Sequence, residues 1–294
     1  MQLRFERLTK TFGDVTAFDI RALVIESGEF FTFTGRPKSG KSTVLKVIAG
    51  LEAPSSGTLT ADGHVLNDVA PPDRGVVFVS PDNRLDLGPH QCALCDQPAS
   101  GLDPLQRSAM TEELKSLHAA SGTTVIYATD DQAEALRLSD RVAVLKDGVV
   151  QQVGTPADVF ERPANIVIAA YFGNPSMNVV PGILEKDGVA VEIGPRALQL
   201  NGVVAEDYAR DVFLGVRPEH VRLQPDPSKG WRGRVTRVES LGAKTRIDIR
   251  VDGGDFVARE DGESRYQPGD QVSVAMAPAH LHVFDARGGR LEVR

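Results

Sequence analysis

The stretch "GRPKSGKST" (Gly35–Thr43) constrains the fold more than any other part of the sequence. It fits the pattern G-x-x-x-x-G-K-S, follows the apolar stretch "EFFTFTG" and precedes "STVLKVIAGL". The apolar residues of that last stretch recur at helical spacing. A strand, a glycine-rich loop and a helix in this order bind phosphate oxygens through backbone N–H groups and the helix N-terminus. The sequence therefore predicts an α/β core with a nucleotide-phosphate site.

The side chains of this loop have separate predicted roles. Lys41 would reach the terminal phosphates of ATP or ADP, and Ser42 would offer its hydroxyl to Mg²⁺. Lys38 adds positive charge, which either strengthens anion binding or faces solvent. The loop residues predicted to bind the nucleotide are Gly35, Lys38, Ser39, Gly40, Lys41, Ser42 and Thr43.

A second anchor for Mg²⁺ is predicted at the end of the apolar stretch "CALCD". Asp96 closes this predicted strand, and a carboxylate there can hold the metal through water. The two cysteines, Cys92 and Cys95, have C-x-x-C spacing but no second Cys/His cluster to complete a zinc site. Residues three apart in a strand point to opposite faces, so we expect both thiols to be small core fillers.

The pattern of predicted secondary structure changes near residue 178. Before it, strands alternate with helices, with hairpin turns predicted at Asp62-Gly63 and Asp147-Gly148 and a long helix ending at Gly122. After it, short β-rich pieces are separated by Gly, Pro and Asp, which favours an all-β barrel or sandwich. We expect two domains, residues 1–177 and 178–294.

Bulk composition excludes some classes of protein. The net charge of −7 argues against broad binding of nucleic acid through its phosphates. No apolar run approaches the roughly 18–20 residues of a membrane-spanning helix, and "MQLRFERLTK" has no apolar signal core. We therefore expect a cytoplasmic protein that is not integral to a membrane.

Several stretches together resemble one family. "GRPKSGKSTVLKVIAGLEAPSSGTL", "PPDRGV", "DQPASGLDP", "VIYATDDQAEAL" and "RVAVLKDGVVQQVGTPADVFERPAN" are similar to ATP-binding-cassette ATPases. The match is to the subunits that power maltose-type and glycerol-phosphate-type sugar importers. "FGNPSMN", "LGVRPEHVRL" and "PAHLHVFDARGGR" resemble the OB-like, TOBE-type regulatory domain of that branch.

This resemblance implies further roles. Phe12 stands where the family stacks an aromatic ring on adenine, and Asp103 belongs to the loop that contacts the opposite subunit. The resemblance also implies a homodimer held by the C-terminal β domain. A protein regulator or transporter subunit would be its partner, at the inner face of the membrane.

Three positions depart from the family pattern. Gln97 replaces the glutamate that deprotonates the attacking water, and an amide cannot take that proton. Asp130 replaces a histidine that contacts the γ-phosphate, so an anion would face an anion. Val79 replaces a glutamine that senses Mg²⁺ and couples to the membrane subunits.

The largest departure is a missing segment. Ser80–Cys95, only 16 residues, separate Val79 from Asp96, where the family places several tens more. Those residues form a helical subdomain with the "LSGGQ" signature, and "SGGQ" occurs nowhere in this chain. We expect that this subdomain is lacking and that "SPDNRLDLGPHQ" is a surface loop between two adjacent strands.

The first hypothesis is a pseudo-ATPase that binds ATP or ADP, hydrolyses it weakly or not at all, and acts as a regulatory or scaffolding dimer. The second is a working importer subunit beside a complete partner. The third is a sensor whose β domain binds a small ligand. The remaining alternative is a degenerate family member that has lost its function. His280 and His282 are expected to share one face of a strand, as a structural pair or as metal ligands.

Overall fold

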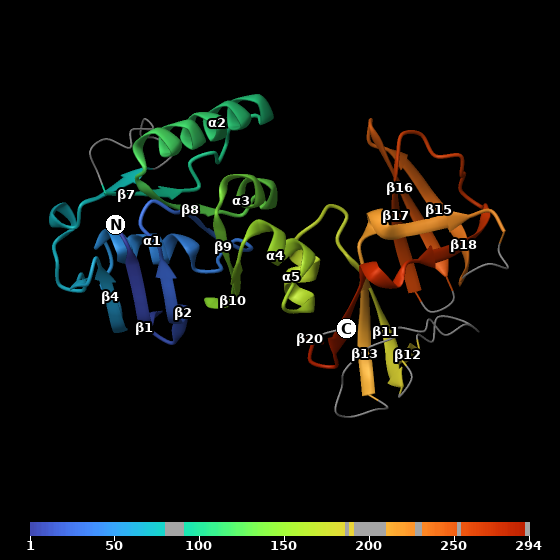
Figure 1. Cartoon of the computed structure of the whole chain (residues 1–294), viewed down its shortest axis with the longest axis horizontal. Coiled ribbons are helices and arrows are strands. Elements are labelled where there is room, and N and C mark those ends of the chain that lie inside the picture. Colours follow the sequence, from blue (N-terminus) through green and yellow to red (C-terminus); the bar gives the residue numbers. More distant parts are fainter. Residues whose placement is uncertain (80–90, 186–187, 191–209, 227–230, 252–253, 292–294) are drawn as a thin grey trace. The chain divides into compact units, whose positions relative to one another are not determined.

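The computed structural model describes residues 1–79, 91–185, 188–190, 210–226, 231–251 and 254–291 (Figure 1). The chain divides into two compact units, residues 1–162 and residues 163–294. The domain boundary expected at residues 177/178 stays a prediction.

The first unit is built on a ten-stranded sheet with the order β5-β4-β1-β2-β10-β9-β3-β8-β7-β6. The run β9-β3-β8-β7-β6 is parallel, whereas β1, β2, β4 and β5 pair antiparallel. The strands are β1 (Leu3–Phe12), β2 (Val15–Ile25), β3 (Phe30–Thr34), β4 (Ser56–Ala61), β5 (His64–Val65), β6 (Val76–Val79), β7 (Cys92–Asp96), β8 (Thr124–Thr129), β9 (Arg141–Lys146) and β10 (Val149–Gly154).

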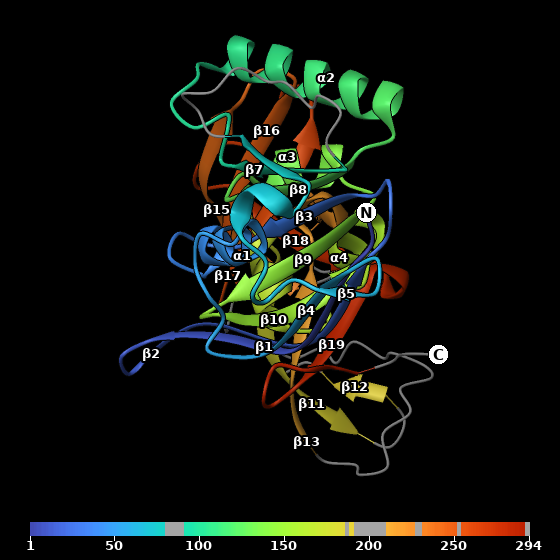
Figure 2. The ribbon, with the colours of Figure 1, turned by 90° about the vertical axis from the view of Figure 1, so that its left-hand side faces the viewer.

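Helices cover both faces of the parallel strands. They are α1 (Lys41–Ala49), α2 (Pro104–Ser121), α3 (Gln132–Leu138) and α4 (Pro156–Glu161), with a 3₁₀ turn η1 (Pro71–Asp73). Apolar residues of α1 pack with Leu94 of β7 on one face, and Leu114 of α2 packs with Ala93 on the other. Figures 1 and 2 show α2 over β7 and β8, on the side opposite α1.

The two cysteines follow the same division. Cys92 belongs to the core on the α1 face and Cys95 to the core on the α2 face, as strand alternation predicts. Both are fully buried, and burial raises the pKa of each thiol to about 12. Thiols held protonated in this way are inert packing groups.

Local sequence signals decide where several elements turn or end. Asp62-Gly63 joins β4 to β5 and Asp147-Gly148 joins β9 to β10, with positive φ at all four residues as a tight hairpin requires. In α2 the Asp103 side chain accepts from the backbone N–H groups of the first turn, and Gly122 ends the helix with φ 63°. The two predicted hairpin turns and the predicted helix end at Gly122 are confirmed.

The second unit is β-rich, as predicted. One sheet has the order β12-β11-β13-β19-β20 and the other β14-β18-β15-β16-β17. Its core includes Trp231 stacked on Phe256, with ring centroids 6.4 Å apart. The elements are α5 (Ile166–Tyr171), β11 (Asn178–Glu185), β12 (Gly188–Ala190), β13 (Arg210–Val216), η2 (Pro218–His220), β14 (Val221–Gln224), β15 (Trp231–Ser240), β16 (Lys244–Val251), β17 (Gly254–Asp261), β18 (Gln271–Met276), η3 (Pro278–His280), β19 (Leu281–Asp285) and β20 (Arg290–Leu291).

One expectation for the second unit is wrong. His280 and His282 do not share a strand face, because His280 ends the η3 turn and only His282 lies in β19. The ring of His280 instead stacks on His220, with centroids 3.8 Å apart and planes 3° from parallel. Among the described residues, no group of three or more His, Cys, Asp or Glu side chains is arranged to hold a metal.

The strands that flank the shortened segment are direct neighbours. β6 and β7 pair in parallel from Val76 opposite Cys92 to Val79 opposite Cys95. The expectation that the segment joins adjacent strands is therefore confirmed. The predicted surface loop itself falls on residues 80–90, which lie outside the described residues.

Candidate functional site

The loop after β3 can be formed only with glycine at two positions. Gly35 and Gly40 have φ of 151° and 101°, values that L side chains rarely adopt. A Cβ atom on Gly35 would lie 2.1 Å from the backbone oxygen of Leu145, and one on Gly40 would lie 2.2 Å from that of Ala17. The loop is thus pressed against neighbouring backbone, which fixes where α1 begins.

Lys41 places a cation inside this loop. Its side chain is only 3% exposed, and Nζ donates to the carbonyl oxygens of Gly35 (2.8 Å) and Arg36 (2.9 Å) and to Ser39 Oγ (3.1 Å). Burial lowers the pKa of Lys41, and the nearby carboxylates of Asp130 and Asp96 act in the opposite direction. The ammonium group therefore lies where phosphate oxygens bind in loops of this kind.

Ser42 and Asp96 come together although they are far apart in sequence. The Ser42 hydroxyl, in the first turn of α1, donates to Oδ1 of Asp96 at the end of β7 over 2.9 Å. Both side chains are partly exposed. A hydroxyl and a carboxylate are the oxygen ligands that Mg²⁺ prefers when it is shared with a phosphate group. This donor set fits Mg²⁺.

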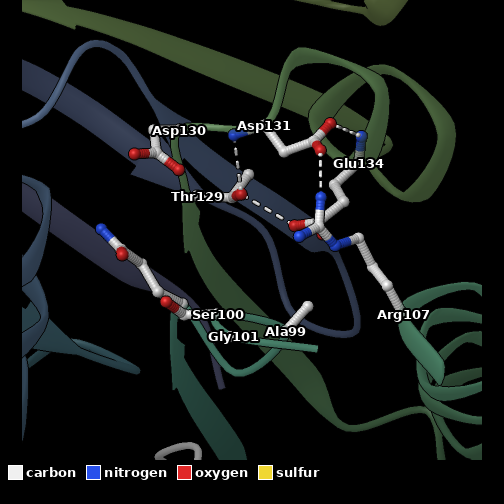
Figure 3. Close-up of a pocket in the computed structure, with 9 residues that line it drawn as sticks. Ala99, Ser100, Gly101, Arg107, Thr129, Asp130, Asp131 and Glu134 are labelled. Carbon is white, nitrogen blue, oxygen red and sulfur yellow. Dashed lines mark hydrogen bonds and ion pairs between the residues drawn. The ribbon is translucent and has the colours of Figure 1, made fainter. Parts of the chain in front are cut away.

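Beside the loop, a pocket of about 300 Å³ opens at the carboxyl ends of β7 and β8 (Figure 3). Gln97 and Asp130 both line it. Gln97 has φ of 48°, and its backbone N–H donates to the carbonyl of Ala128 over 2.9 Å. The two positions that depart most from the family's chemistry are thus brought into one pocket.

A charged network that the sequence did not predict lines another side of this pocket, across Thr129 from Asp130 (Figure 3). Arg107 of α2 forms an ion pair of 3.0 Å with Asp131, and its Nε lies 3.6 Å from Glu134. Glu134 is 4% exposed and accepts from the hydroxyls of Tyr127 (3.0 Å) and Thr129 (2.7 Å). The network holds α2 and α3 to the end of β8.

The remaining predicted residues lie outside this pocket. Val79 is 2% exposed and packs in the core on the α2 face. Phe12, at the end of β1, is 49% exposed, with Lys10 Nζ 4.6 Å from its ring centroid. Within the loop, Ser39 is buried and Lys38 is exposed, with φ of 66°. Thr43, in the first turn of α1, is partly exposed.

Three parts of the chain match described families. Residues 19–143 match "ABC transporter", residues 173–221 "MalK OB fold domain" and residues 214–284 "TOBE domain". The alpha-glucoside transport ATP-binding protein AglK of Rhizobium meliloti is 31% identical to this chain, over 97% of this chain and 98% of its own length. The chain belongs to the ABC transporter family.

Two further relatives show the same breadth of similarity. The sn-glycerol-3-phosphate import ATP-binding protein UgpC of Cereibacter sphaeroides is 31% identical, in an alignment that covers 90% of this ABC protein and 92% of UgpC. The trehalose import ATP-binding protein SugC of Mycobacterium tuberculosis is 31% identical, with 98% and 97% covered. The predicted order of an ATPase core followed by OB and TOBE domains is therefore confirmed for this ABC protein.

Family membership brings general properties. ABC ATPase subunits bind ATP with Mg²⁺, dimerise and associate with the membrane subunits of a transporter. No helix among the described residues of this ABC protein is both long and apolar enough to cross a membrane.

Proposed function

We propose that this chain is an ATP-binding subunit of a sugar importer and binds ATP or ADP with Mg²⁺ at Gly35–Thr43. The Ser42–Asp96 hydrogen bond of 2.9 Å, beside the Lys41 ammonium group, carries this proposal. The relatives named above act on alpha-glucosides, glycerol phosphate and trehalose, which favours a sugar or sugar phosphate as the transported class. The chain would act at the inner face of the membrane.

Each proposed contact follows from the position of its residue. Lys41 and the backbone N–H groups at the start of α1 bind the phosphates, with Lys38, Ser39 and Thr43 beside them. Ser42 binds Mg²⁺ directly and Asp96 holds it through water. Mg²⁺, when bound, supplies charge neutralisation for the phosphate oxygens. Phe12 stacks on the adenine ring, which its 49% exposure permits.

We further propose that hydrolysis is slow. Gln97 lines the pocket beside the loop, and its amide can orient a water molecule but cannot accept a proton. Help from a general base is typically worth about 10²–10⁴-fold in rate. The chain is therefore proposed to bind nucleotide tightly and to hydrolyse ATP slowly.

The proposed lack of a helical subdomain has two supports. β6 ends at Val79 and β7 begins at Cys92, so only residues 80–91 are available between them. The alignment with AglK runs over 354 residues, although this chain has only 294, so the relative carries residues without a counterpart here. A subunit built this way needs a complete partner subunit to supply the signature. We propose that the contact between the two runs through residues 178–294.

Co-purification from native membranes tests the importer role. Tagged full-length chain is expected to retain a sugar-importer membrane subunit together with a second, complete ATP-binding subunit. If the chain binds nucleotide but recovers no membrane subunit, the importer role is contradicted and a free-standing regulatory dimer is favoured.

A further inference from the structure

Asp130 and the phosphate-binding loop begin side by side at the edge of the sheet. β3 and β8 are parallel neighbours, with Thr34 opposite Thr129 as their last pair. The hydroxyl of Thr34 donates to the carbonyl of Thr129 over 3.0 Å, which ties the two strand ends together. Gly35 and Asp130 are the next residues, so the two loops start about 5 Å apart, the spacing of paired strands.

The Lys41 ammonium group is held by the loop and feels the charge of Asp130. Its Nζ is 2.8 Å from the carbonyl oxygen of Gly35. The charges of Asp130 and Asp96 both favour the protonated form of Lys41, against the effect of burial on its pKa. One buried cation is therefore under the influence of two carboxylates.

Asp130 lines the same pocket as the ion pairs of Arg107. The neighbouring acids Asp131 and Glu134 face Arg107, with oxygen–nitrogen distances of 3.0 Å and 3.6 Å. Figure 3 shows Asp130 on the other side of Thr129 from this network. Asp130 is exposed and lines the pocket that also contains Gln97. A ligand that enters this pocket therefore meets the carboxylate of Asp130.

We propose that Asp130 makes this site selective for nucleoside diphosphates over nucleoside triphosphates, an inference that rests on the proposed nucleotide site. The loop and Lys41 bind the phosphates nearest to the helix, and a third phosphate extends toward the ends of β7 and β8. There it meets a carboxylate, and like charges a few ångströms apart repel. A diphosphate leaves this space open, and the favourable electrostatic interaction of Asp130 with Lys41 is then kept.

Titration calorimetry with Mg²⁺-ADP and Mg²⁺-ATP on the full chain tests the inference. The wild-type chain is expected to bind ADP about tenfold or more tightly than ATP, which one charge–charge contact can supply. In Asp130→Asn, which has the same shape without the charge, the ratio is expected to fall below about threefold through tighter ATP binding. Asp130→Glu is expected to keep the wild-type preference.

A matched control separates local charge from net charge. Glu113→Gln removes one exposed carboxylate from α2, outside the pocket, and is expected to leave the ADP preference unchanged. Equal affinities for the two nucleotides in the wild-type chain, or an unchanged ratio in Asp130→Asn, would overturn the selectivity while leaving the nucleotide site intact. Binding of neither nucleotide to the wild-type chain would overturn the proposed site itself.

Discussion

The hydroxyl of Ser42 donates a hydrogen bond of 2.9 Å to Oδ1 of Asp96, 54 residues away in the sequence. This contact joins the first turn of α1 to the carboxyl end of β7. It brings together the two oxygen ligands proposed for Mg²⁺, and it depends on the parallel order of β3, β8 and β7.

Asp96→Asn is expected to remove the contribution of Mg²⁺ to nucleotide binding. The amide oxygen can still accept from Ser42, so the loop keeps its shape, but the charge that attracts the metal is lost. Changes to groups that hold a metal indirectly typically cost about 10–100-fold in affinity. Calorimetry with Mg²⁺ and with EDTA measures the effect. An Asp96→Asn variant whose affinity still rises with Mg²⁺ as in wild type would contradict the assignment.

When the chain is assayed with a complete partner subunit that supplies the signature, Gln97→Glu is expected to raise ATP turnover by tenfold or more, because it supplies a proton acceptor in the pocket. A typical enzyme with an intact general base turns over at about 10 per second. Loss of the base costs about 100-fold or more, so the wild-type chain is expected to turn over at about 0.1 per second or less. A steady-state phosphate-release assay measures both rates. Wild-type turnover near 10 per second would contradict slow hydrolysis.

Arg74→Ala is expected to destabilise the first unit by about 2–4 kcal/mol. Arg74 is 4% exposed and donates to the carbonyl oxygens of Val47 and Ile48 near the end of α1, at 2.8 Å and 2.9 Å, and to that of Val69 at 2.8 Å. Removing the guanidinium takes away all three donated hydrogen bonds, although the carbonyl of Val47 keeps the backbone N–H of Gly50. Guanidinium-induced unfolding followed by circular dichroism measures the loss. Arg21→Ala, at an exposed position, serves as the control. Equal stability of the two variants would contradict the stabilising role of Arg74.

The second unit is expected to lose stability as the pH falls from about 6.5 to about 4. Burial, followed by the charges of Arg290 and Arg217, lowers the pKa of His282 from 6.5 to about 4. Below pH 6.5 the unfolded chain therefore binds a proton that the folded chain does not. Folding becomes less favourable by about 1–3 kcal/mol over this range.

The fluorescence of the single tryptophan, Trp231, which is buried in the second unit, follows this transition. His282→Gln should flatten the pH dependence, whereas His64→Gln in the exposed β5 should not. An unchanged pH slope in His282→Gln would show that other groups dominate.

The parts of the fold that sequence could predict are those with strong local signals. Gly35 and Gly40 mark the loop because no other residue fits their φ values and close backbone contacts. Asp62-Gly63 and Asp147-Gly148 mark hairpins for the same conformational reason. Alternation along β7 was enough to place Cys92 and Cys95 on opposite faces.

The parts that could not be predicted depend on contacts between distant segments. Nothing near Arg107 indicates that it faces Asp131 and Glu134, because that pairing arises only when α2 and α3 pack on the same side of β8. The stacking of His280 on His220 likewise depends on the meeting of two turns far apart in sequence. Strand alternation does not extend to His280, because the Pro278–His280 turn precedes the strand.

Nucleotide binding at Gly35–Thr43 is proposed to depend on Lys41. Calorimetric titration of Mg²⁺-ADP and Mg²⁺-ATP into wild type, Lys41→Ala and Lys46→Ala measures this dependence. Lys46 lies exposed on the same helix and controls for the loss of a cation. Wild type and Lys46→Ala are expected to bind alike, and Lys41→Ala is expected to bind at least about tenfold more weakly. No binding by the wild-type chain, or equal binding by Lys41→Ala, would contradict this proposal.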